Sequence, residues 1–164
     1  MNNQKKLLPL SLWPYSLKVL ASLYLFLILI GYGVALVKIY DLSHFNLSTV
    51  QTLYGPESHE NLDELIIPQS FKSMLSVTHV HALSQPMMLA LAGLILVFST
   101  RSEKTKTIVI VMILGGALMS NVSPWLVRYI HLNFIGLLPF SQILIGLGLV
   151  LTSVFSFQEL WKKS

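Results

Sequence analysis

The sequence predicts an all-α integral membrane protein whose four transmembrane helices form an antiparallel bundle. Composition is the first observation behind this prediction. Of the 164 residues, 54% are hydrophobic and 11% are charged, and the mean hydropathy is +0.68. Soluble domains carry about 25% charged residues. A chain so poor in charge cannot cover its surface with solvated groups, so the lipid bilayer must cover it, and its length suits a single membrane domain over residues 1–164.

Four uncharged stretches are the second observation, since a membrane-spanning helix needs about 20 mostly apolar residues. They predict helices at about residues 17–39, 74–98, 107–130 and 135–158, with one larger external loop at about 40–72. The apolar part of the first stretch, Val19 to Val37, is too long for a signal peptide and indicates a retained helix. In the loop, Leu47, Val50 and Leu53 recur at helical spacing and predict a short surface helix.

Basic residues predict the orientation, because short cytoplasmic loops carry an excess of Lys and Arg. One side of the membrane would hold eight of them and the other three, namely Lys38, Lys72 and Arg128. The richer side carries both ends of the chain, which predicts N-in and C-in topology. We therefore expect a multi-pass membrane protein with both ends of the chain in the cytoplasm.

Polar side chains gather in the outer half of the predicted bundle, and they define the candidate site. His79 and His81 open the second span, and His81 shares a helix face with Gln85. Residues two apart on a helix project about 200° from each other, so the two imidazoles cannot bind one metal ion from a regular helix. We expect His81 to face the bundle. The remaining members of this predicted polar pocket are Asn121, Arg128, His131 and Gln142.

Each of these residues also has an ordinary structural interpretation. A histidine at a membrane boundary can serve as an interfacial anchor, which applies to His79, His81 and His131. Asn121 and Gln142 can be interhelical hydrogen-bonding groups rather than ligand contacts.

Several chemistries find no support in the sequence. The absence of cysteine excludes disulfides, thiol catalysis, iron–sulfur ligation and covalent attachment of c-type haem within this chain. No nucleotide-binding glycine motif, HExxH sequence or nucleophile elbow is present. Basic residues do not cluster on an aromatic-rich polar face, so no nucleic-acid partner is expected. The isolated chain is therefore not expected to be an enzyme.

The segment from Thr78 to His81, followed by a long apolar helix, resembles small bacterial inner-membrane proteins that open their second helix with Thr/Ser-His-x-His. Those proteins have four helices, a Tyr-x-Gly-like element in the first external loop, and a final hairpin with Pro-Trp-like and Gln-containing patterns. Similar elements here are Tyr54-Gly55-Pro56, Pro124-Trp125 and Ser141-Gln142. Some relatives carry a c-type cytochrome segment in the external loop, and this chain has no cysteine for one.

Three functions remain open from the sequence. The first is a redox-linked role, in which His81 and His131 ligate the iron of a b-type haem, or flank a quinone, near the outer face. His79, Gln85, Asn121 and Gln142 would line that site, and Arg128 would pair with a haem propionate. The second is a non-enzymatic accessory or assembly subunit that contacts other membrane or redox proteins. The third is a zinc or copper site formed by His79, His81, His44 or His59.

Overall fold

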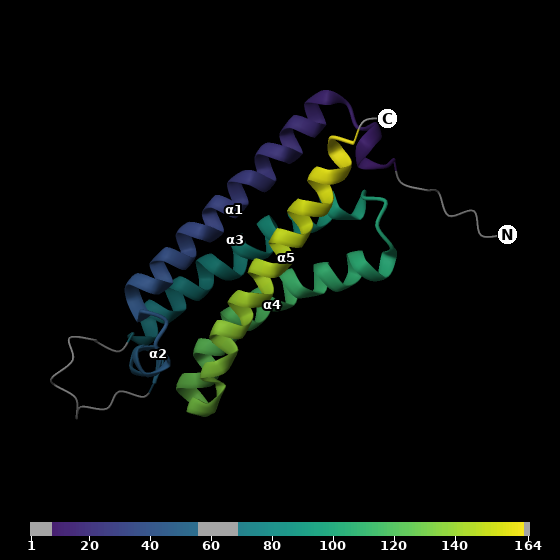
Figure 1. The fold of residues 1–164 in the computed structure, drawn as a ribbon. Coiled ribbons are helices and arrows are strands. Elements are labelled where there is room, and N and C mark those ends of the chain that lie inside the picture. Colours follow the sequence, from purple (N-terminus) through teal and green to yellow (C-terminus); the bar gives the residue numbers. More distant parts are fainter. Residues whose placement is uncertain (1–7, 56–68, 163–164) are drawn as a thin grey trace.

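The computed structural model describes residues 8–55 and 69–162 and confirms the all-helical fold with four helices long and apolar enough to cross a membrane. Figure 1 shows them as antiparallel rods, with short connections from α3 to α4 and from α4 to α5 and a longer connection, which contains α2, from α1 to α3. The elements, in chain order, are η1 (Leu10–Leu12), α1 (Tyr15–Ser43), α2 (Leu47–Tyr54), α3 (Phe71–Val97), α4 (Glu103–Tyr129), η2 (Leu132–Gly136) and α5 (Leu137–Leu160).

The two ends of the bundle differ in what they carry. One end holds η1, the start of α1, the connection from α3 to α4 and the end of α5, and we call it the termini side. The other end holds α2, the start of α3, the end of α4 and η2, and we call it the α2 side. By the basic-residue bias, the termini side is the one expected to face the cytoplasm.

The core lies between α3, α4 and α5, with Leu25 of α1 completing it, and the hairpin of α4 and α5 makes the most extensive helix contact. Because only residues 130–136 connect them, α4 and α5 form a tight antiparallel hairpin. Glycines allow the close approach: a Cβ at Gly116 would lie 2.8 Å from Ile145 Cγ1, and one at Gly148 would collide with Ile113 Cγ2. The core residues are Leu25, Leu89, Ala92, Ile113, Ala117, Ile145 and Leu149.

Helix α1 packs more loosely than the other three spanning helices, because only 11% of the residues in its most apolar stretch are buried. Side-chain hydrogen bonds hold it at three heights. The Tyr32 hydroxyl donates to the Gln142 carbonyl at 2.6 Å, and Trp161 Nε1 donates to Ser22 Oγ at 3.0 Å. The Tyr24 hydroxyl donates to the Met88 carbonyl between these two levels. Most of the surface of α1 is therefore left for lipid or a partner.

The helices extend further than the charge-free stretches suggested. Helix α1 ends at Ser43, where His44 adopts a left-handed conformation with φ of 47°. Helix α4 begins at Glu103 because the side chain of Ser102 caps it by accepting from Thr105 N. Helix α5 runs to Leu160, which places Glu159 in its last turn. Capping and packing, not charge, therefore set these ends.

The short surface helix in the first connection is confirmed as α2. The side chain of Asn46 caps its first turn by accepting from Ser48 N at 2.9 Å. Gly55 ends it, and a Cβ there would lie 2.5 Å from the Gln51 carbonyl oxygen. Burial raises the pKa of the Tyr54 phenol in this helix above its ordinary value. The remainder of the loop predicted between the first two spans, residues 56–68, lies outside the described part of the chain.

Candidate functional site

Aromatic side chains mark two levels along α3 that match the thickness of a bilayer. On the α2 side, Trp125 Nε1 donates to Thr78 Oγ1 at 2.8 Å, and its ring packs on Phe71 and Tyr129. On the termini side, Trp13 packs against Phe98 with ring centroids 5.3 Å apart. The 20 residues from Thr78 to Phe98 rise about 30 Å, which is the thickness of the hydrocarbon core. His79 and His81 therefore lie at the α2-side boundary and just inside it.

The predicted polar residues Gln85 and Asn121 meet each other. Asn121 Nδ2 donates to Gln85 Oε1 at 2.9 Å and to the Ala117 carbonyl at 2.8 Å. Both side chains are half-buried between α3 and α4. Their amides link the two helices, which matches the interhelical interpretation given above.

Arg128 and Gln142 are likewise in contact with protein groups. Arg128 Nη1 donates to the Gln69 carbonyl and lies 3.5 Å from Met74 Sδ, which ties the end of α4 to the start of α3. The backbone carbonyl of Gln142 accepts from Tyr32, so this residue serves the contact between α1 and α5.

The two histidines of α3 do not face the polar groups of α4 and α5. Both imidazoles are exposed, and no hydrogen bond or ion pair joins them to the rest of the described residues. The expectation that His81 points into the bundle is wrong for a geometric reason. Helix α3 buries a narrow stripe that passes through Gln85 and Leu89, and His81 lies about 40° round the helix from Gln85, just beyond the edge of that stripe.

His131 lies at the start of η2 and is also exposed. Its Nδ1 accepts from Asn133 N at 3.1 Å, so a neutral imidazole in this position carries its proton on Nε2. Binding of iron through Nε2 would require that contact to be released. Within the described chain, no group of three or more His, Cys, Asp or Glu side chains is placed to hold a metal ion. His59, which belongs to the loop metal hypothesis, lies outside it.

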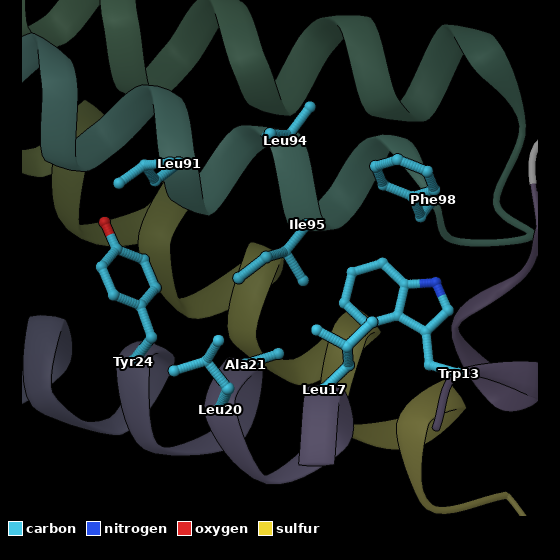
Figure 2. Close-up of a pocket in the computed structure, with 9 residues that line it drawn as sticks. All are labelled: Trp13, Leu17, Leu20, Ala21, Tyr24, Leu91, Leu94, Ile95 and Phe98. Atoms are coloured by element: carbon cyan, nitrogen blue, oxygen red, sulfur yellow. The ribbon is translucent and has the colours of Figure 1, made fainter. Parts of the chain in front are cut away.

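Two cavities among the described residues lie toward the termini side. The first is an apolar groove of about 370 Å³ between α1 and α3. Figure 2 shows side chains of both helices facing each other across it, with Trp13 opposite Phe98 at one end and Tyr24 below Leu91 at the other. On the α2 side, where the sequence predicted a polar pocket, Asn121 is hydrogen-bonded to Gln85 and Trp125 to Thr78.

The second cavity was missed by sequence reasoning. It measures about 390 Å³ and lies between the connection from α3 to α4 and the last turns of α5. Glu159 in its wall is 7% exposed, and its Oε2 accepts from Thr100 N at 2.6 Å and from Thr100 Oγ1 at 3.0 Å. Thr152, Ser156 and Glu159 follow one another at helical spacing on the buried face of α5, and this polar stripe was a signal available in the sequence. The cavity is lined by Thr100, Arg101, Phe155, Gln158, Glu159 and Lys162.

Comparison with protein families agrees with this architecture. Residues 44–164 match the Aq_1264_TM family, which is described as a transmembrane helical domain. The chain belongs to this family. The match begins at His44, the residue that follows α1, so α2 to α5 form the shared domain and α1 lies outside the match. Comparisons with curated proteins and with solved structures gave no match.

Proposed function

We propose that this transmembrane helical domain is a non-enzymatic accessory subunit of a membrane complex, and that it contacts its partner through the exposed side of α3 that His79 and His81 flank. One observation carries the proposal: two imidazoles lie at and just inside a membrane boundary, exposed and without a polar partner among the described residues. Ionisable groups that face lipid at this depth are costly. A partner helix that offers a polar group to His79 or His81 would remove that cost.

The surroundings of the histidines support a contact surface. Val80 is 58% exposed and Leu83 64% exposed on the same stretch of α3. His79 and His81 project about 200° apart, so they flank this exposed side of α3 with Val80 between them. Interhelical hydrogen bonds add to close packing where helices meet within the membrane.

Site-directed photocrosslinking in native membranes tests this proposal. A photoreactive side chain replaces Val80, and a control carries it at Leu118, which is 66% exposed on α4. We expect one protein adduct of defined mass from position 80 and only lipid adducts from position 118. In the background of His79→Ala and His81→Ala, the adduct from position 80 should decrease.

Two results would contradict the accessory role. Lipid adducts alone at both positions, together with a single-chain particle after mild detergent extraction, would leave no partner. An adduct of twice the mass of this chain would identify the partner as a second copy, and self-association would replace the accessory role.

A redox cofactor is the second candidate function, and the open position of the imidazoles favours it. His81 and His79 face the side from which a quinone in the lipid phase would approach, and His81 would then donate to or accept from the quinone oxygen. A b-type haem ligated by His81 and His131 is the alternative form of this candidate. Gln85, Asn121, Arg128 and Gln142, which the sequence grouped with the histidines, would then shape the protein around the site rather than bind the ring.

An absorbance spectrum of protein purified after haem-supplemented expression tests the haem form. A Soret band that is lost in His81→Ala would support it, and no band in the unaltered protein would remove it. For the quinone form, co-purified quinone is extracted and compared between the unaltered protein and His81→Ala. Equal amounts in both would remove that form.

A further inference from the structure

The polar cavity on the termini side is unusual because its cationic and anionic groups are kept apart. Arg101 and Lys162 lie on its exposed rim, whereas the carboxylate of Glu159 is turned into the protein. Among the described residues the one ion pair is Lys106 with Glu103, so neither rim cation is neutralised by a carboxylate. The cavity therefore offers positive charge outward.

Arg101 is held in position before any ligand arrives. Its Nη2 donates to Gln158 Oε1 at 2.6 Å, and its guanidinium carbon lies 4.4 Å above the centre of the Phe155 ring. A guanidinium carries five N–H donors in one plane, so most of them remain available after this single hydrogen bond. A planar, fixed set of donors is suited to the oxygens of a phosphate group.

The orientation of the Glu159 carboxylate limits the repulsion that this group would exert on a bound anion. Its Oε2 is occupied by the backbone and side chain of Thr100, and its Oε1 is buried without a hydrogen-bond partner among the described residues. Both oxygens are therefore withdrawn from the open side of the cavity. The carboxylate holds the connection from α3 to α4 against α5, which also fixes Arg101, the next residue after Thr100.

The cavity lies at the level of the lipid headgroups. Trp161 follows α5 directly and donates to Ser22 of α1, and Trp13 packs on Phe98 at the same end of the bundle. Tryptophans at such positions mark the interface between hydrocarbon and water. A preformed cationic cavity at this level matches the headgroup of an anionic phospholipid in both charge and depth.

The geometry points to a binding site for the phosphate of an anionic phospholipid headgroup, formed by Arg101, Lys162 and Gln158. Arg101 contacts the phosphate oxygens, Lys162 adds charge from the end of α5, and the Gln158 amide keeps the guanidinium in place. Occupation of the site joins the connection after α3 to the end of α5 and so stabilises the termini side of the bundle. This site is independent of the histidine surface on α3, because it lies at the opposite end of that helix.

Native mass spectrometry of the full chain in detergent tests the site. The protein is titrated with phosphatidylglycerol, and separately with phosphatidylcholine of the same acyl chains. We expect tighter binding of phosphatidylglycerol by the unaltered protein. In the variant R101Q/K162Q the dissociation constant should rise about thirtyfold, since each basic residue near a membrane surface contributes about 1 kcal/mol.

Two further variants separate charge from geometry. Lys104→Gln removes an exposed cation at the termini side that does not line the cavity. The affinity of this variant for phosphatidylglycerol should equal that of the unaltered protein. Arg101→Lys keeps the charge but loses the planar donors above Phe155, and its affinity should fall between the other two. Circular dichroism in the same detergent should show equal helix content in all variants, because the altered side chains are exposed.

Four outcomes would overturn the inference. Equal binding of both lipids, or equal loss in Lys104→Gln, would indicate general attraction without a built site. Binding of inorganic phosphate alone that equals binding of phosphatidylglycerol would make this a soluble-phosphate site. Displacement of phosphatidylglycerol by an oligo-glutamate peptide at lower concentration than by phosphate would instead indicate an acidic protein partner.

Discussion

Asn121 of α4 donates a hydrogen bond to Gln85 of α3 across 2.9 Å within the membrane-spanning part of the bundle. The same amide also donates to the Ala117 carbonyl, so both of its N–H groups are used. Neither residue carries charge, and each would face an apolar environment without the other. The pair fixes the register of α3 against α4 at the depth where the sequence alone predicted a ligand pocket.

Replacement of Gln85 by Leu should lower the free energy of unfolding by about 0.6 to 1.7 kcal/mol, the range found for hydrogen bonds between membrane helices. The double variant with Asn121→Leu should cost less than the sum of the single variants, because both remove the same bond. Unfolding by SDS in mixed micelles measures these values. Met87→Leu, at a position 67% exposed, is the control and should have no effect. If the losses of unfolding free energy in the two single variants added up in the double variant, the coupling of Gln85 and Asn121 would be contradicted.

Two adjacent glycines of α4 should respond in opposite ways to alanine. A Cβ at Gly116 would lie 2.8 Å from Ile145 Cγ1 and 3.1 Å from the Ser141 carbonyl oxygen, whereas a Cβ at Gly115 meets nothing within 4 Å. Gly116→Ala should therefore destabilise the hairpin by about 1 to 3 kcal/mol, as overpacked cores do. Gly115→Ala should be neutral or slightly stabilising because alanine favours the helix. The thermal midpoint in detergent compares them, and equal midpoints would contradict the close approach of α4 and α5.

The buried carboxylate of Glu159 should act as an acceptor that holds the connection between α3 and α4. Glu159→Leu leaves the Thr100 N–H without its acceptor and should cost about 1 to 3 kcal/mol. Glu159→Gln keeps a carbonyl oxygen in this place and should cost less. Asp41→Asn serves as the control, since Asp41 is exposed near the end of α1 and no ion pair joins it to another described residue. The same SDS titration ranks the three, and an equal effect of Leu and Gln at position 159 would exclude the acceptor role.

The family match includes the helix that carries His79 and His81. The matched domain begins where α1 ends, and α3, with His79 and His81 on its exposed face, is the first spanning helix of that domain. The contact surface proposed for the accessory role therefore belongs to the shared domain, and the loosely packed α1 lies outside it.

The sequence alone determined the membrane class, the number of spans, the tight hairpin of α4 and α5 and the short helix α2. These features follow from local properties: apolar length, charge-free intervals and the spacing of Leu47, Val50 and Leu53. The sequence also determined the depth of His79 in the membrane, because its position along the span follows from counting residues.

Only the tertiary structure decided which side chains face one another. His81 and Gln85 differ by about 40° round α3, a difference smaller than the uncertainty of any face assigned by periodicity, yet Gln85 is bonded to Asn121 and His81 is exposed. Glu159 looked like a residue beyond the last span, and it became a buried acceptor because α5 continues and Thr100 from a distant connection meets it. Such contacts depend on how separate helices rotate and cross, and the pattern within one helix does not contain that information.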